Sequence, residues 1–313
     1  MNSPAEILPS NIHDAELSDA RLPANDTATS WNAFLNLFIE KKARGTRLAR
    51  CRHQGPLYVQ KPFFPEGQFL PHIYLLHPPG GVVSGDCLRI NVDIAKDAST
   101  LLTTPGAGRV YRARKDKKSQ GQHVCITVAE GGSAEWLPLE NIVYPDANAE
   151  LSTKIRLAEG SHFIGWDVTS LGLPAQQAAF SSGSLSQRIE VWVNDQPKII
   201  EYLQFSGSDA LKHARAGLQD FPINGTFIAG PFNQEALEEY DVPLIDKLRE
   251  LSAKPRLRDV KSIEGISVVN GFIIGRYLGH CSESAKNLFT EYWALVRPSL
   301  LHRPACPPRI WST

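Results

Sequence analysis

The feature that most constrains the fold is an alternating segment held between two turns rich in glycine and proline, within residues 74–112. From residue 87 to 95, apolar and polar residues alternate, which is the period of a strand with one buried face. Residues 78–81 before it and 105–108 after it carry Pro and Gly, so neither can lie inside a helix or strand. The sequence therefore predicts a strand between two tight corners, the first ending at Asp86.

Similar alternation recurs along the chain at spacings typical of an all-β fold. The further candidate strands are residues 57–60, 72–77, 123–128, 151–157, 185–193 and 198–205. The last two flank the turn Asn194-Asp195-Gln196-Pro197 and are expected to pair as a hairpin. The connections look short and hairpin-like, and no alternation of strands with helices appears, which argues against a doubly wound sheet.

Helical periodicity appears only in the last third of the chain. Pro243 is a suitable first-turn residue for a helix, and residues 235–240 are a weaker candidate. The strongest helix is predicted to start at Ser282 as N-cap and to end at Pro298. Residues 266–277, between the two helices, read as strand interrupted by a glycine. The apolar stripe of the last helix is Ala285, Leu288, Phe289, Tyr292, Trp293 and Val296.

Composition bounds the class of protein. The chain has 313 residues with 33 Lys+Arg and 33 Asp+Glu, and this neutral balance argues against nucleic-acid binding. No signal peptide or membrane-spanning apolar run is visible, so a cytoplasmic protein without a membrane partner is expected. Residues 1–30 are polar and are expected to form a flexible extension, and residues 31–313 a single β-rich domain.

Five segments together resemble one family, the urease accessory protein UreD, called UreH in some organisms. They are LLHPPGGVVSGD, LLTTPGAGRVYR, EWLPLENIVYP, FIGWDVTSLGLP and the carboxyl-terminal PPRIWST, in one order from about Gly55 to the end. Ser84 stands where the family more often has a glycine. The resemblance implies a mainly β fold, with many strands in a helicoidal, β-helix-like arrangement and about two α-helices in the C-terminal half.

The resemblance also implies a function without catalysis. A UreD-type maturation factor would bind apo-urease and a UreF-type partner, and through it a UreG-type GTPase, and would assist nickel insertion, with the chain itself as a candidate nickel conduit. No tightly bound cofactor is expected, only transient Ni²⁺. The chain has no G-x-x-x-x-G-K-[ST] motif, which agrees with GTP chemistry residing in another subunit. Two alternatives stay open: a β-helical enzyme acting on a polysaccharide, and a plain β scaffold without metal transit.

Acids set among apolar strand residues are the candidate metal ligands. Asp86, Asp167 and Glu201 have such surroundings, and a carboxylate facing a β interior is costly unless it is paired, hydrated or bound to a cation. The three predict a wet internal passage that binds a divalent ion weakly. The alternative is that each faces solvent. His77 and the pair His280-Cys281 are possible soft-metal ligands, but no second ligand lies at a diagnostic spacing.

Two further regions have the residue types of a partner interface. Tyr111 and Arg112 belong to the basic run 109–118, whose alternative reading is a solvated loop. Aromatic and Arg anchors are typical of interfaces, although core packing is the default for the helical one. These anchors are Trp293, Arg309, Ile310 and Trp311.

Overall fold

The computed structural model describes residues 30–232, 241–254 and 261–312. The expected extension, up to residue 29, and the candidate helix at 235–240 lie outside these residues. The strands are β1 (Asn32–Lys42), β2 (Gly45–Gln54), β3 (Tyr58–Val59), β4 (His72–Leu76), β5 (Cys87–Ile94), β6 (Ser99–Thr103), β7 (Gly108–Val110), β8 (Gln120–Val128), β9 (Ser133–Trp136), β10 (Asn141–Val143), β11 (Asn148–Leu157), β12 (His162–Leu173), β13 (Ala178–Ala179), β14 (Ser184–Val193), β15 (Gln196–Ser206), β16 (Ile223–Gly230), β17 (Ile263–Val269) and β18 (Phe272–Gly279). The helices are η1 (Pro174–Gln176), η2 (Ala210–Lys212), α2 (Asp241–Ser252), α3 (Ser282–Leu301) and η3 (Arg309–Ser312).

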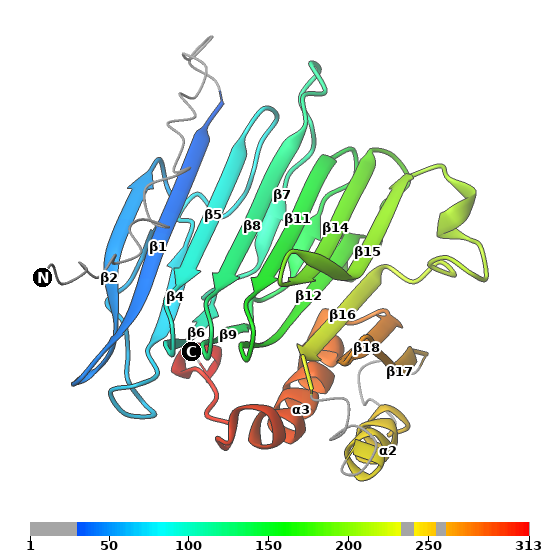
Figure 1. The fold of residues 1–313 in the computed structure, drawn as a ribbon. Coiled ribbons are helices and arrows are strands. Elements are labelled where there is room, and N and C mark those ends of the chain that lie inside the picture. Colours follow the sequence, from blue (N-terminus) through cyan, green and yellow to red (C-terminus); the bar gives the residue numbers. More distant parts are fainter. Residues whose placement is uncertain (1–29, 233–240, 255–260, 313) are drawn as a thin grey trace, which may run out of the picture.

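The strands form two sheets, and the chain crosses repeatedly from one sheet to the other. The first sheet has the order β15-β14-β11-β8-β5-β1-β2, and the second has the main path β17-β18-β16-β12-β9-β6-β4-β3. The chain runs from β5 to β6, then β8 to β9, then β11 to β12, so that each step crosses to the other sheet (Figure 1). This confirms the mainly β, helicoidal arrangement, with two α-helices among the described residues.

The expected hairpin-like connections occur mainly at the margins of the sheets. The consecutive pairs β1–β2, β14–β15 and β17–β18 are antiparallel, which includes the predicted hairpin over 185–205, and the short β13 pairs antiparallel with the end of β12. Inside the first sheet, β5, β8, β11 and β14 instead pair in parallel. The prediction was wrong there because each connection leads to the opposite sheet, and the chain returns one strand further along.

The main core lies between the sheets and follows from the alternation in the sequence. In β5, Leu88, Ile90, Val92 and Ile94 are buried, whereas Arg89, Asn91 and Asp93 are exposed. The buried set packs with residues of the second sheet such as Leu102 and Trp136. Each such apolar side chain contributes about 1.5–3 kcal/mol relative to an exposed one. The outward face of the first sheet remains polar.

The α-helices α2 and α3 both pack against the second sheet. Helix α3 packs on β12, β16 and β18 and also contacts α2 (Figure 1). Its whole predicted stripe is buried in a second core, as are Leu244, Ile245 and Leu248 of α2. Across the described ranges, no helix is long and apolar enough to cross a membrane.

The ends of α3 differ from the prediction. Cys281, not Ser282, is the N-cap residue, and the helix continues past Pro298 to Leu301. A proline in the last turns removes a single backbone donor, so the helix can continue. It ends where His302 takes the left-handed conformation and donates its N–H to the Pro298 carbonyl.

A buried charge network fixes α3 to the second sheet. Arg297 is fully buried, and its Nε donates to Glu135 Oε2 at 2.8 Å and its Nη2 to Glu66 Oε1 at 2.7 Å. Glu135 also accepts from Trp293 Nε1 at 2.6 Å, and Glu66 contacts His72 Nε2 at 2.8 Å. Two carboxylates therefore face one guanidinium, and removing Arg297 would take away the cation that pairs with both of them.

Candidate passage between the two sheets

A cavity of about 80 Å³ lies between the sheets. It is found where the second sheet is interrupted, between β6 and β7 and between β9 and β10. Apolar walls come from both sheets, including Ile90 and Val124 of the first and Leu75 and Trp136 of the second. Polar side chains also reach it, so the space is not a dry core void. These polar residues are His77, Thr104, Gln122, Asn141, Thr153 and Asp167.

Asp167 is the acidic group of this cavity. It lies on β12, only 8% exposed, and accepts hydrogen bonds from Gln187 Nε2 at 2.7 Å and Thr169 Oγ1 at 3.2 Å. No cation pairs with it among the described residues. Burial raises the pKa of this carboxyl to about 6, and the two hydrogen bonds oppose that rise. Asp167 is therefore a desolvated carboxylate held by neutral donors.

Gln187 connects this cavity to the outside. It lies on β14 of the first sheet and donates to both Asp167 and Thr169 of the second. The same side chain lines an open cleft of about 490 Å³. Its Oε1 is buried and accepts no hydrogen bond within the described part of the chain. Gln187 thus stands between cavity and cleft, with one oxygen still available.

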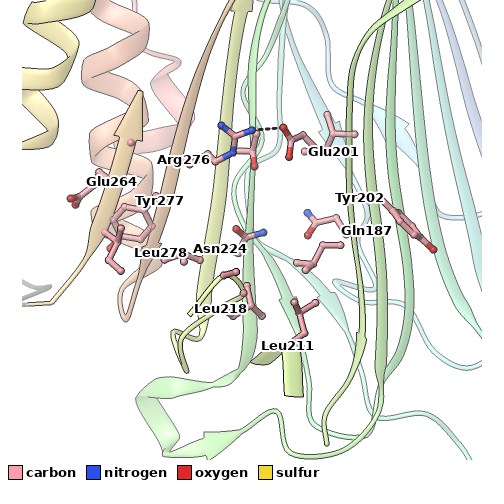
Figure 2. Close-up of a pocket in the computed structure, with 17 residues that line it drawn as sticks. Gln187, Glu201, Tyr202, Leu211, Leu218, Asn224, Glu264, Arg276, Tyr277 and Leu278 are labelled. Atoms are coloured by element: carbon pink, nitrogen blue, oxygen red, sulfur yellow. Dashed lines mark hydrogen bonds and ion pairs between the residues drawn. The ribbon is translucent and has the colours of Figure 1, made fainter. Parts of the chain in front are cut away.

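The cleft opens where the edges of the two sheets separate. Glu201 of the edge strand β15 pairs with Arg276 of β18 across this gap. Figure 2 shows this ion pair above Gln187 and Asn224, which also line the cleft. Of the three predicted acids, Asp167 therefore lines the cavity and Glu201 lines the cleft, and Gln187 lies between the two spaces.

Asp86 has a different role from the one predicted. Its two carboxylate oxygens accept from the backbone N–H of Trp31 at 2.7 Å and of Val83 at 3.0 Å. It thereby closes the glycine-rich corner and fixes the start of β1, and it does not line the cavity or the cleft. Its neighbour His77 does line the cavity. Burial lowers the pKa of His77, and the Asp86 charge partly offsets this.

Most of the polar groups that line the cavity and the cleft are carboxylate, amide and hydroxyl oxygens, and His77 adds one imidazole to the cavity. Scattered oxygen groups bind divalent ions more weakly than clustered thiolates or imidazoles. Nowhere in the described ranges do three His, Cys, Asp or Glu side chains group closely enough to hold an ion together.

Comparison with known proteins decides the family. Residues 32–312 match the model of the UreD urease accessory protein family. The chain belongs to this family. Among proteins named urease accessory protein UreD, that of Marinomonas sp. (strain MWYL1) is 48% identical and covers 91% of each chain. Those of Aliivibrio fischeri (strain ATCC 700601 / ES114) and Dechloromonas aromatica (strain RCB) are 40% and 36% identical, covering 92% and 94% of this chain and 99% of each relative.

For this UreD-family chain, the structure separates the predicted interface residues. Arg112 is exposed and pairs with Asp146 at 3.2 Å. Tyr111 is half-buried, and its ring occupies the space that a Cβ at Gly81 would need. Together they form the rim of the glycine corner. Arg112 is accessible to a partner, whereas Tyr111 also serves to pack this corner.

The carboxyl-terminal anchors are partly used by the fold itself. Trp293 is fully buried, so the expectation that it is an exposed anchor was wrong: it lies in the middle of the α3 stripe, bonded to Glu135. Trp311 is half-buried against Trp293, with ring centroids 6.1 Å apart, and donates to Thr103 Oγ1 at 3.1 Å. Ile310 is half-buried and Arg309 is exposed. The accessible part of this surface is thus Arg309 with the outer sides of its two neighbours.

Sequence reasoning missed two residues of the passage. Gln187 was read only as part of an alternating strand, and Arg276 was not considered. Gln187 could have been found, because it is a neutral amide at a position of the alternating strand where a buried apolar residue is expected. Arg276 offered no comparable signal, because its pairing with Glu201 joins residues 75 positions apart.

Proposed function

We propose that this chain is a non-catalytic urease maturation factor that binds apo-urease and a UreF-type protein, and through the latter a UreG-type GTPase. Membership of the UreD family supports a role in urease maturation and favours it over a polysaccharide-acting enzyme. The cytoplasm is the expected location. In this proposal the GTP chemistry belongs to the partner, and no cofactor is held tightly.

The proposal includes passage of Ni²⁺ between the two sheets. The observation that carries it is Asp167, a buried carboxylate without a cation among the described residues, joined through Gln187 to an open cleft. A carboxyl with a pKa of about 6 is mostly ionised at a pH of about 7.5. An incoming ion would gain the Asp167 charge and the available Gln187 oxygen, while Glu201 marks the cleft end.

The exchangeability of the ion follows from the same groups. An anionic and a neutral oxygen ligand attract Ni²⁺ without the soft donors that would trap it. The ion would therefore lose only part of its hydration and could move on. A scaffold without metal transit would need none of these groups, and this difference makes the proposal testable.

The test is nickel loading of urease at limiting nickel, with the full chain coexpressed with its partners and urease. Asp167→Asn and Glu201→Gln should yield nickel-poor urease while the variants still copurify with urease and the UreF-type protein. Asp93→Asn, an acid on the exposed outer face of β5, is the matched control and should load urease normally.

Each outcome separates the parts of the proposal. Normal loading by both passage variants would refute the passage and leave the scaffold role intact. Loss of copurification in these variants would show that the acids are structural. Failure of the unaltered chain to bind either urease or the UreF-type protein would refute the maturation role itself.

A further inference from the structure

A cysteine and a histidine converge on the outer face of the first sheet, on the side away from the cavity. Cys87 lies on β5 directly opposite Gly121 of β8, and Glu150 of β11 lies opposite Gly121 on its other side. His123 is two residues beyond Gly121 on the same strand, so both residues lie on the same face of the sheet. The three side chains therefore come from three adjacent parallel strands.

Gly121 leaves the space into which Cys87 and His123 point. A Cβ built at this glycine would lie 3.0 Å from His123 Nε2 and 3.6 Å from Cys87 Sγ. Both atoms are thus directed at the same point above the sheet, which any other residue would fill with its side chain. Gly121 does not have a positive φ, so the backbone conformation does not require a glycine here.

The imidazole of His123 is held in a suitable orientation. Its Nδ1 lies 2.8 Å from Ser152 Oγ on β11. Nε2 makes no hydrogen bond in the described part of the chain, and it is not among the buried unpartnered atoms, so it is open to solvent. When Nδ1 donates to Ser152, Nε2 carries the lone pair, which is the tautomer of a metal ligand fixed by its second nitrogen.

The protonation states are compatible with metal binding at neutral pH. Burial, with Arg89 adding to it, lowers the pKa of His123, so the ring is neutral. Burial raises the pKa of the Cys87 thiol, so the thiol proton must leave when an ion binds. The charge of Arg89 lowers the pKa of both Cys87 and His123, and the charge of Glu150 raises both, so their effects partly cancel.

We propose that Cys87 Sγ and His123 Nε2 together bind a divalent transition-metal ion of the Ni²⁺, Co²⁺ and Zn²⁺ class above Gly121. One metal–sulfur and one metal–nitrogen bond form, the thiol proton passes to solvent, and water completes the coordination shell. A thiolate and an imidazole are the ligands that these ions prefer. Since no third ligating side chain is grouped with them in the described ranges, the site has two protein ligands and exchanges its ion readily.

This site goes beyond the proposed passage and does not depend on it. The passage lies between the sheets and its polar lining is mostly oxygen groups, whereas this pair lies on the solvent side of the first sheet. Its softer donors suit the first capture of an ion from solution. The two sites can therefore be tested separately, because Asp167 and Gln187 face the space between the two sheets.

The experiment is a Co²⁺ titration of the reduced full-length chain, followed by the near-ultraviolet absorption of the cobalt–thiolate bond. The unaltered chain should show this band with saturation at one ion. Cys87→Ser should lose it, and His123→Gln should weaken binding by at least about tenfold. Cys125→Ser, on the same strand and face but on the side of His123 away from Gly121, is the matched control and should keep the band.

Gly121→Ala is the decisive variant because it retains both ligands and fills the space between them. The atoms nearest to its Cβ would belong to side chains, so the fold should be retained, as circular dichroism can show, while the band disappears. An unchanged band in Gly121→Ala or Cys87→Ser would overturn the proposal. So would a loss confined to Cys125→Ser, or the absence of any band in the unaltered chain at millimolar cobalt.

Discussion

Replacing Asp167 by Asn should stabilise the folded chain in a way that depends on pH. The carboxyl has a pKa of about 6 in the folded state, against 3.8 ordinarily, because it is buried. Since the folded pKa is the higher one, its contribution to stability is fully present below about pH 3.8 and is lost as the pH rises through about 6. Asn carries no charge and loses nothing over this window.

The magnitude follows from the distance between the two pKa values. Each pH unit between them corresponds to about 1.4 kcal/mol, so ionising Asp167 in the folded chain costs roughly 3 kcal/mol. Gln187 and Thr169 both donate to the same carboxylate oxygen, so the oxygen of the introduced amide can still accept from both. Its NH₂ group can donate to the Gln187 oxygen that has no partner in the described residues. The Asp167→Asn chain should therefore be about 2–3 kcal/mol more stable than the unaltered chain at about pH 7.5, and equal to it near about pH 4.

Urea unfolding at several pH values between about 4 and 8 measures this difference, with intrinsic tryptophan fluorescence as the signal. Glu159→Gln, in an exposed turn, is the control and should follow the unaltered chain at every pH. Parallel curves for the unaltered chain and Asp167→Asn would refute the reasoning, because they would show that Asp167 is well hydrated. A variant that is destabilised at neutral pH would show instead that the carboxylate itself supports the sheet.

Three further predictions concern other parts of the chain. Arg297→Met should lower the free energy of unfolding by roughly 3–5 kcal/mol, because it leaves Glu135 and Glu66 buried without their cation; denaturant titration measures this, and a loss below about 1 kcal/mol would contradict it. A chain beginning at Ser30 should unfold at the same denaturant concentration as the full chain, since the removed residues are polar in sequence; a clear shift of the midpoint would refute this. Arg112→Glu should weaken copurification with the UreF-type protein, while stability changes by less than about 1 kcal/mol because its ion pair is exposed; unchanged copurification would remove Arg112 from the interface.

Elements with a strict period could be predicted from sequence. The alternation of β5 and the stripe of α3 both appear in the structure as buried faces, because burial on one face imposes a period of two or about 3.6. Strand pairing could not be predicted in the same way. A buried face says nothing about which sheet a strand joins, so the parallel coil came from the family resemblance and not from periodicity.

The candidate site was only partly accessible to the same reasoning. Asp167 could be found because an acid inside an apolar strand is costly anywhere. Asp86 looks alike in sequence, but one of its oxygens accepts from the backbone N–H of Trp31, 55 positions away, and the other from that of Val83. Trp293 was misjudged because a wide apolar stripe does not distinguish a side chain bonded to a buried carboxylate from one that faces a partner. Such distinctions depend on contacts made only in the folded chain.

The buried charge network of Arg297, Glu66 and Glu135 also affects how the chain folds while it is being synthesised on the ribosome. Glu66 and Glu135 leave the ribosome long before Arg297, which follows Glu135 by 162 residues. Until the last helix is made, the second sheet has neither its apolar cover nor the counter-ion of these two acids. We expect nascent chains to keep this face open and to complete the fold only on release, which makes premature termination near the carboxyl end a route to aggregation.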